Sequence, residues 1–185
     1  MSLLIKFGVN VLKRVELLIN DTLYRQYMNY NLEEEREPKF CQHDFSHHLD
    51  VARIAYILVL EHNDLNYFIK DSGLSGKLAA KEVIYAAGLL HDIGKWKEYR
   101  DGEDLAACSA RLSRTILPRA LFTPDEIEII CRAICEQRNI NKDISLLGEK
   151  LYRGNNLSRM CSECHHNEEC PRAGNQEIST GAAEY

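Results

Sequence analysis

The feature that most constrains the fold is an apolar stretch, residues 82–96 (EVIYAAGLLHDIGKW), which carries two adjacent polar residues near its end. Residues 83–90 have almost no polar face, which predicts a helix that is buried on all sides. His91 and Asp92 follow at the buried end and must find partners, because an unpartnered polar group there costs about 2–7 kcal/mol. An imidazole beside a carboxylate suits a first-row transition metal. Gly88 lies one turn earlier on the same side, and its missing side chain leaves room for an ion or a ligand.

The alternative for this His–Asp pair is a structural role at a helix end, where histidine favours the negative end of the helix dipole and aspartate forms a turn. A second histidine weighs against that alternative. Residues 45–62 show an apolar stripe of helical period, and His47 extends it by one turn, so we expect His47 to point inward. His43 and His48 are less well placed. A single histidine on an apolar face is more often a core residue than a ligand, but two such features in one small domain favour a site.

The predicted fold class is all-α, because apolar residues recur at intervals of three and four and alternating β-branched runs are absent. A chain of 185 residues is long enough for one domain with a sizeable core. We expect a helical domain over residues 1–160, followed by a cysteine-rich extension and a flexible tail over residues 161–185. Helices are predicted at about residues 10–37 (with a break at 20–21), 45–62, 82–94, 105–117, 124–137 and 144–160, with a capping box at Thr123–Glu126, a linker at 71–76 and a polar loop at 95–104.

The composition excludes several classes of protein. A net charge of −5 argues against a protein that binds the nucleic-acid backbone. The chain has no run of about 18 apolar residues that could span a membrane, and residues 1–14 lack the cleavage site of a signal peptide. The charged run at residues 33–37 is expected to be a solvated helix end. We therefore expect a cytoplasmic protein without nucleic-acid or membrane partners, and leave open whether it forms homo-oligomers.

Three of the seven cysteines cluster after the last predicted helix, with the spacing Cys161-x2-Cys164-x5-Cys170. A C-x2-C pair is the chelating spacing of zinc and iron–sulfur sites, and a closed structural site needs four ligands. Cys41 is the first candidate for the fourth ligand, and one of the histidines at residues 165–166 is the second. The cluster therefore predicts a structural zinc ion or an iron–sulfur cluster, and the alternative is a set of incidental surface thiols.

The order of these polar residues and the sequence around them resemble the HD superfamily of metal-dependent phosphohydrolases. The matching segments are HHLDVARIAY (47–56), AAGLLHDIGKW (86–96) and LYRGNNLSR (151–159), and the resemblance spans residues 40–160. It implies an all-α bundle in which a His, a His-Asp pair and a later Asp hold a divalent metal.

Carried over residue by residue, the first three ligands of the family are His47, His91 and Asp92. The fourth departs from the pattern, because Asn155 stands where the family has its last Asp. An amide oxygen can coordinate a metal but brings no charge, so the resemblance predicts a metal site that is weaker than that of an intact relative.

Two further positions depart from relatives of this type. These relatives often carry a histidine in the segment that ends here at Leu105, and another where this chain has Gln137. Those histidines build a second metal position or a phosphate contact, so we expect a single-metal site. Its two histidines and one carboxylate suit Fe(II), Mn(II), Ni(II) or Zn(II).

The function that the resemblance implies is metal-assisted hydrolysis of a small phosphate-containing ligand, either a nucleotide or another phosphate ester. Asp92 and Lys95 are the candidate catalytic residues, with Lys95 contacting the phosphate, and Arg138 is the second candidate for a phosphate contact. Lys95 is alternatively a solvated loop lysine. The alternative function is a catalytically inactive regulatory domain that senses a nucleotide, a metal or redox state. A third alternative is an interaction module held together by its cysteine site.

Overall fold

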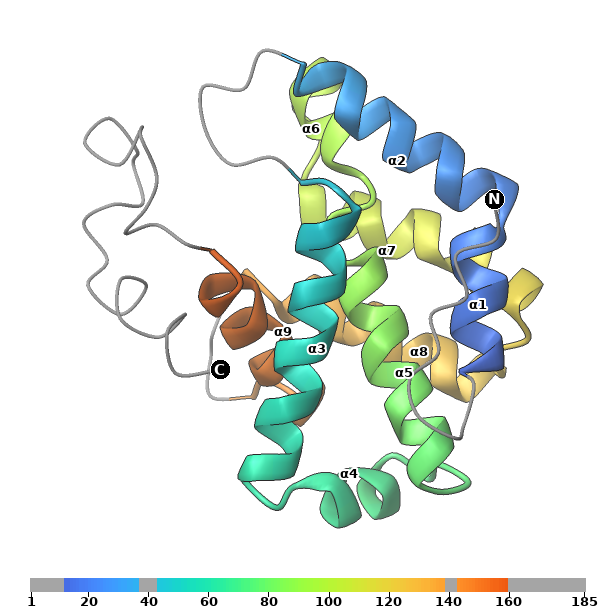
Figure 1. The fold of residues 1–185 in the computed structure, drawn as a ribbon, viewed down its shortest axis with the longest axis vertical. Coiled ribbons are helices and arrows are strands. Elements are labelled where there is room, and N and C mark those ends of the chain that lie inside the picture. The colour runs from blue at the N-terminus through green and yellow to red at the C-terminus, as the bar shows by residue number, and fades with distance from the viewer. Residues whose placement is uncertain (1–11, 37–42, 139–142, 160–185) are drawn as a thin grey trace.

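The computed structural model describes residues 12–36, 43–138 and 143–159 (Figure 1). These residues form helices and no strands, which confirms the predicted all-α class. The helices are α1 (Lys13–Asn20), α2 (Thr22–Glu34), α3 (Phe45–Glu61), α4 (Leu65–Asp71), α5 (Lys77–Leu90), α6 (Lys95–Asp101), α7 (Leu105–Ile116), the short 3₁₀ helix η1 (Leu117–Ala120), α8 (Pro124–Glu136) and α9 (Leu146–Leu157). No helix of this described part is both long enough and apolar enough to cross a membrane.

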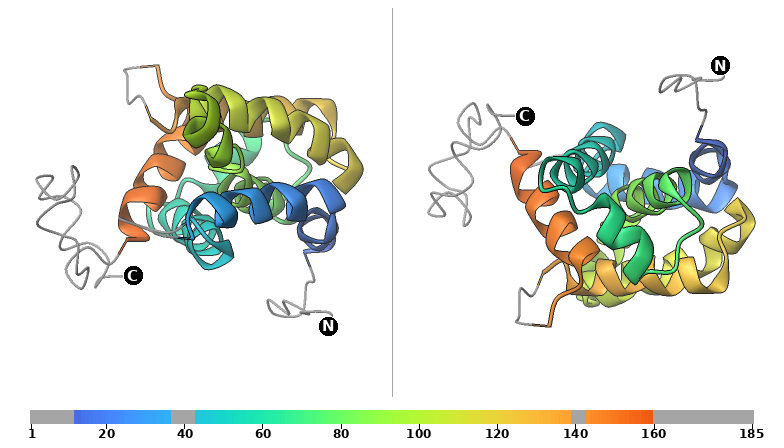
Figure 2. Two further views of the ribbon diagram at one scale, coloured as in Figure 1. Left: turned by 90° about the horizontal axis from the view of Figure 1, so that it is seen from above. Right: turned by 90° about the horizontal axis from the view of Figure 1, so that it is seen from below.

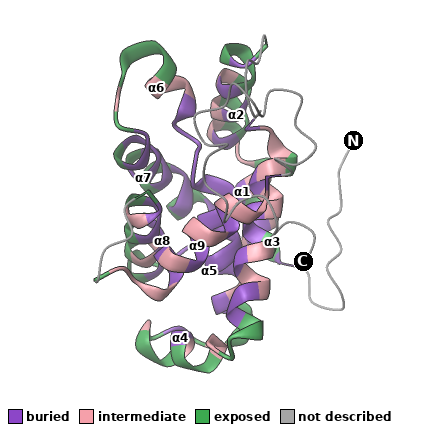
Figure 3. Cartoon of the chain, turned by 90° about the vertical axis from the view of Figure 1, so that its left-hand side faces the viewer, coloured by how far each residue is buried: buried purple, intermediate pink, exposed green. Residues whose placement is uncertain are grey.

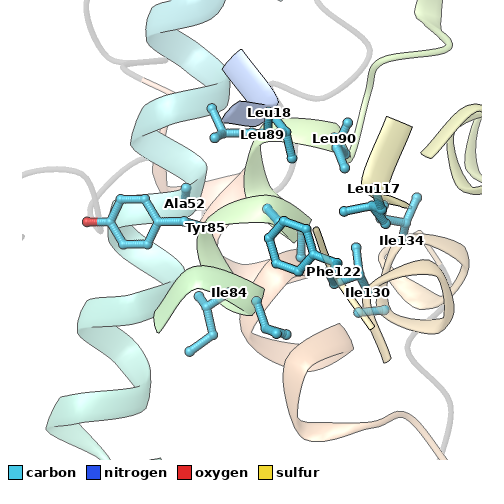
Figure 4. Close-up of a cluster of buried hydrophobic side chains, with 14 of the residues drawn as sticks. Leu18, Ala52, Ile84, Tyr85, Leu89, Leu90, Leu117, Phe122, Ile130 and Ile134 are labelled. Atoms are coloured by element: carbon cyan, nitrogen blue, oxygen red, sulfur yellow. The ribbon is translucent and has the colours of Figure 1, made fainter. Parts of the chain in front are cut away.

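Helix α5 forms the centre of the bundle, as its apolar sequence predicts. It contacts α1, α3, α4, α7, α8 and α9, and the views from above and below show it surrounded by other helices (Figure 2). Its residues are buried almost continuously from Glu82 to Leu90 (Figure 3). In the core, Leu89 and Leu90 lie in one cluster with side chains of α1, η1 and α8 (Figure 4). Burial on all sides fixes the direction of α5 and therefore the place where the residues that follow it emerge.

Helix α3 approaches its neighbours closely at two glycines. A Cβ atom on Gly88 of α5 would lie 2.5 Å from the Cα atom of Ala52, and one on Gly154 of α9 would lie 2.9 Å from the carbonyl oxygen of Val51. The space beside Gly88 is therefore filled by the backbone of α3. The expectation that it leaves room for an ion or a ligand is wrong, and its actual role is to bring α3 against α5.

Several local signals in the sequence are confirmed. The predicted break after Asn20 is present, and Asp21 caps α2 by accepting hydrogen bonds from the backbone N–H groups of its first turn. The capping box of Thr123 and Glu126 is present at the start of α8.

Two helices were missed by the sequence patterns. Helix α4 is short, and residues 95–101, predicted as a polar loop, form α6. Its charged side chains pair within the helix, Lys95 with Glu98 and Lys97 with Asp101, and Gly102 ends it in the left-handed conformation with φ +68°. The predicted cysteine-rich extension and flexible tail, as well as Cys41, lie outside the described residues.

Candidate metal centre

The predicted ligands come together where three helices end. His47 lies in the first turn of α3, His91 and Asp92 form the turn after α5, and Asn155 lies in the last turn of α9. The imidazole centroids of His47 and His91 are 5.3 Å apart. Ser158 joins α9 to α3, because its Oγ contacts both the carbonyl oxygen of Asn155 (3.0 Å) and Nδ1 of His47 (3.3 Å).

His47 is held with one ring nitrogen facing the centre of the site. Asp44 caps α3 and accepts a hydrogen bond from the His47 backbone N–H (2.9 Å), which fixes this residue in the first turn. The Ser158 hydroxyl donates to the carbonyl of Asn155, so it accepts from Nδ1–H of His47. The lone pair of His47 therefore remains on Nε2, which is buried and has no partner among the described residues. Burial, and then the charge of neighbouring His91, lowers the pKa of His47 far below its usual value and keeps the ring neutral.

The His91–Asp92 pair shows the same arrangement. The Nδ1–H group of His91 donates to the carbonyl of Gly88 (2.7 Å), so its lone pair is on Nε2, which lies 3.3 Å from Oδ2 of Asp92. Oδ1 of Asp92 is buried without a hydrogen-bond partner in the described structure. Burial acts to raise the pKa of Asp92, but the electrostatic and hydrogen-bond interactions with the imidazole of His91, followed by those with His43 and His48, outweigh it and hold this pKa well below its ordinary value.

Side-chain amides from two other helices hold the backbone of this turn. Asn31 of α2 is fully buried; its Nδ2 donates to the carbonyl of Asp92 (3.0 Å), and its Oδ1 accepts from the backbone N–H of Trp96 (2.9 Å). Gln137, just after α8, donates through Nε2 to the carbonyl of His91 (2.7 Å). Gln137 therefore positions the turn, at the point where relatives often carry a histidine.

His43 joins the centre, although the helical pattern placed it less well. One ligand atom each from His43, His47 and Asp92 lies within 4.8 Å of the others, and Nε2 of His43 is 3.6 Å from Oδ2 of Asp92. The expectation that His43 is less well placed than His47 rested on helical spacing. His43 precedes the capping residue Asp44, where the chain has left the helix.

Glu35 holds the other side of the His43 ring. Its carboxylate accepts hydrogen bonds from Nδ1 of His43 (2.6 Å), from the backbone N–H of His43 (2.7 Å) and from the Tyr99 hydroxyl (3.0 Å). Burial acts to raise the pKa of Glu35, but the hydrogen bonds and charge of His43 outweigh it and lower this pKa. A carboxylate on Nδ1 leaves the lone pair on Nε2 and makes it more basic, which is the usual support for a metal-bound histidine.

Replacing Glu35 by glutamine is expected to weaken divalent-metal binding by about 10- to 100-fold, the usual cost of losing an outer carboxylate that orients a ligand. The measurement is a competition titration against a chromogenic chelator. Glu34→Gln is the matched control, because it removes the same charge one residue away, where Glu34 pairs with Arg100 on the surface. Equal metal affinity in the two variants would show that His43 is not a ligand.

His48 is also buried, contrary to its predicted placement, but it has a structural partner. Its Nδ1–H group donates to the carbonyl of Leu89 (2.8 Å), which ties α3 to α5. Burial, with a further contribution from His91, lowers the pKa of His48 to about 3. The ring therefore stays neutral and contributes to the packing of the two helices.

Asn155 lies at the edge of the site, where its amide is engaged by an arginine. Its Oδ1 accepts a hydrogen bond from Nη2 of Arg159 (3.0 Å), and the same nitrogen lies 3.4 Å from Nε2 of His43. Asn155, which stands where the resemblance places the last metal-binding carboxylate, therefore contacts Arg159. Arg159 in turn contacts His43.

The two predicted phosphate contacts, Lys95 and Arg138, both pair with one carboxylate. Glu98 of α6 forms an ion pair with Lys95 through Oε2 and with Arg138 through Oε1, the latter at 2.9 Å. Burial acts to raise the pKa of Glu98, but Lys95, followed by Arg138, lowers it overall. Lys95 is buried and is not a solvated loop lysine. The carboxylate of Glu98 partly neutralises the positive charges of Lys95 and Arg138.

The donor set fits a divalent transition metal. Nε2 of His47, Nε2 of His91 and Oδ1 of Asp92 are buried and lack partners among the described residues, and each would carry a desolvation cost that a cation removes. Neutral imidazole nitrogens with one carboxylate are typical ligands of iron, manganese, nickel and zinc. The cysteine site predicted from Cys41, Cys161, Cys164 and Cys170 lies outside the described residues.

Comparisons with known proteins show what this chain is similar to. The family model described as HD domain matches residues 44–160. An uncharacterized protein of Clostridium beijerinckii (strain ATCC 51743 / NCIMB 8052) is 36% identical over 157 residues, which is 85% of this chain and 90% of the relative. No solved structure matches the chain significantly.

Proposed function

This chain belongs to the HD-domain family, and from that premise we propose that it is a metal-dependent phosphohydrolase with a weakened metal site. Its substrate would be a nucleotide or another phosphate ester. Two observations carry the proposal: buried ligand atoms of His47, His91 and Asp92 lack partners among the described residues, and one ligand atom each from His43, His47 and Asp92 lies within 4.8 Å of the others. The contact of His43 with Asp92 brings a further ring nitrogen to Asp92, and this nitrogen is also contacted by Arg159.

Different residues of the chain would bind the metal and contact the phosphate in the proposed reaction. A divalent ion bound here supplies Lewis acidity for the hydrolysis of a phosphate ester. His47, His91, His43 and Asp92 would hold the ion, and the turn carrying His91 and Asp92 is kept in place by side chains of other helices. Lys95 lies at the start of α6, three residues after Asp92, and with Arg138 it would offset the charge of a phosphate near the site.

Elemental analysis of the full chain, purified without added metal, tests the metal requirement. We expect one iron, manganese, nickel or zinc ion per chain at the HD site, and hydrolysis of a chromogenic phosphate monoester that is lost on chelation and restored by the same metal. Hydrolysis that persists at full rate after complete removal of metal would contradict the proposal.

We also propose a second metal at Cys41, Cys161, Cys164 and Cys170, either zinc or an iron–sulfur cluster. Support comes from the described residues next to these cysteines: His43 and Arg159 contact each other, and they lie two residues from Cys41 and Cys161 in the sequence. The same elemental analysis distinguishes zinc from iron with inorganic sulfide.

Replacing Asn155 by aspartate is expected to tighten metal binding and to raise phosphoesterase activity, each by about one to two orders of magnitude. The reason is that a carboxylate adds negative charge to a site that otherwise has neutral histidines and one aspartate. Metal affinity is measured by competition with a chelator, and turnover with the chromogenic monoester at saturating metal. Asn156→Asp is the matched control, because it adds the same charge one residue along α9 on a different face of the helix.

The outcome of this exchange also separates the proposed function from its alternative. A gain in metal affinity without activity on any phosphate ester favours the catalytically inactive regulatory domain. The observation that favours this alternative is the engagement of the Asn155 amide by Arg159, which places a cation beside the site. Equal gains in Asn155→Asp and Asn156→Asp would show that residue 155 has no special place in the site.

A further inference from the structure

Arg159 brings a buried positive charge to the metal centre. It is only 7% exposed and follows α9 directly. Its Nε donates to the carbonyl oxygen of Asn155 (3.3 Å) and its Nη2 to the amide oxygen of the same residue (3.0 Å). Both acceptors are neutral, so the hydrogen bonds hold the guanidinium in place without neutralising it.

The described residues offer this guanidinium no carboxylate within ion-pair distance. The hydrogen-bond partner of Arg159 at position 155 is an asparagine, so this residue holds the guanidinium without supplying a counter-charge. A buried charge without a counter-charge is costly, and a bound anion would remove the cost.

The position of Arg159 places such an anion beside the metal-binding atoms. Nη2 of Arg159 lies 3.4 Å from Nε2 of His43, and this nitrogen lies 3.6 Å from Oδ2 of Asp92. Lys95 and Arg138, in contrast, already share the carboxylate of Glu98. Among these three cations, Arg159 is therefore the one that has no carboxylate at ion-pair distance in the described structure, whereas Lys95 and Arg138 share one negative charge between them.

We propose that Arg159 binds the phosphate group of the substrate and supplies the main positive charge that the protein offers to it. This deepens the proposed phosphohydrolase function and rests on it. A planar guanidinium presents parallel N–H groups that match two phosphate oxygens, and no residue of the described chain accepts a hydrogen bond from Nη1 of Arg159. Arg159 is thus a substrate-binding residue, and Asn155 positions it through its side-chain and main-chain oxygens.

The test uses the full chain and inorganic phosphate as the probe, with binding measured by titration calorimetry both after removal of metal and with the metal restored. Arg159→Gln is expected to weaken phosphate binding by about 10- to 100-fold, the usual worth of a hydrogen bond to a charged group. Arg153→Gln is the matched control, because it removes the same charge from α9 at a side chain that pairs with Glu149 on the surface. Arg153→Gln should bind phosphate like the native chain.

Two further measurements distinguish phosphate binding by Arg159 from a merely structural role. Far-UV circular dichroism tests whether the variants are folded. Arg159→Lys keeps the charge but loses the parallel N–H groups of the guanidinium, so it should show an intermediate phosphate affinity. If Arg159→Gln fails to fold, Arg159→Lys carries the test. With the phosphate monoester, loss of a substrate contact should raise KM in a folded variant.

The outcomes distinguish this inference from the proposed function. Native phosphate affinity in both Arg159 variants overturns it, and so does the absence of phosphate binding by the native chain in both metal states. Hydrolysis with an unchanged KM in Arg159→Gln overturns it while leaving the phosphohydrolase function intact. Phosphate binding that depends on Arg159, in a chain that hydrolyses no phosphate ester, supports the anion site and contradicts the hydrolase.

Discussion

The Asp92→Asn variant is expected to lose divalent-metal binding and, with it, phosphoesterase activity. Asp92 is the one carboxylate in the group that it forms with His43 and His47. Without its charge the donors are all neutral and face the cation of Arg159, so a divalent ion would enter a site with a net positive charge. The loss of affinity should be at least about 100-fold, because even the loss of an outer partner of a ligand costs about 10- to 100-fold.

Asparagine retains the shape of Asp92, and Asn31 bonds the backbone carbonyl of residue 92 rather than its side chain, so the turn should keep its conformation. Metal content after dialysis and turnover of the phosphate monoester are the two measurements. Asp101→Asn is the matched control, because it removes the same charge from a side chain that pairs with Lys97 on the surface of α6. Retention of the HD-site metal by Asp92→Asn would exclude Asp92 from the ligands.

The second large effect is expected at Gly88, where alanine should destabilise the fold by about 3 kcal/mol or more, at the upper end of the cost of overpacking a core. The added Cβ would lie 2.5 Å from the Cα atom of Ala52 and 2.6 Å from its backbone nitrogen. Backbone atoms of a packed helix cannot rotate away, so α3 would have to move off α5. This reverses the usual effect of glycine-to-alanine exchange inside a helix, which stabilises by about 0.5–1 kcal/mol.

The free energy of unfolding, from urea denaturation of the metal-free protein, measures this effect. Gly148→Ala is the comparison, because the atoms nearest to its new Cβ belong to the side chains of Glu136 and Ile144 and not to the backbone of a packed helix. We expect a clearly smaller loss of stability for Gly148→Ala. Similar losses in the two variants would mean that the approach of α3 to α5 is not what makes glycine necessary at position 88.

The arrangement of the site shows which parts of it a sequence can predict. The buried helix α5, the inward-facing His47 and the His91–Asp92 pair follow from the period of apolar residues, which is a local property. What fills the space beside Gly88 depends on a helix elsewhere in the chain. A missing side chain reveals that something approaches closely, but the sequence pattern does not distinguish a backbone from an ion.

The partner of Lys95 and Arg138 was not predicted because the helix that carries it, α6, was missed. With residues 95–101 read as a loop, Lys95 had no predicted partner. In α6 it lies one turn from Glu98, which is also reached by Arg138. The short length and high charge of α6 give it no apolar period, and contacts that the sequence pattern does not show accompany the helix: ion pairs within it, Gly102 at its end and the packing of Trp96 against Tyr30 of α2.

The role of Glu35 could not be predicted either, because Glu35 lies within a run of charged residues. The charged run at residues 33–37 was expected to be a solvated helix end, and Glu33 and Glu34 do contact Arg100 near the surface. Glu35 is instead buried and holds His43. A run of charged residues does not show which member turns inward, because that depends on where the chain places a histidine afterwards.

The amide groups that hold the His91–Asp92 turn have a consequence for experiments at different acidity. Asn31 and Gln137 do not gain or lose protons, so their hydrogen bonds to the turn are as strong in acid as at neutrality. The frame of the His91–Asp92 turn is therefore insensitive to acidity, whereas the carboxylate of Glu35, which orients His43, and that of Asp92 can take up protons. A change of metal occupancy with acidity in the folded protein would thus report the protonation of these carboxylates and of the ligands and not a loosening of this turn.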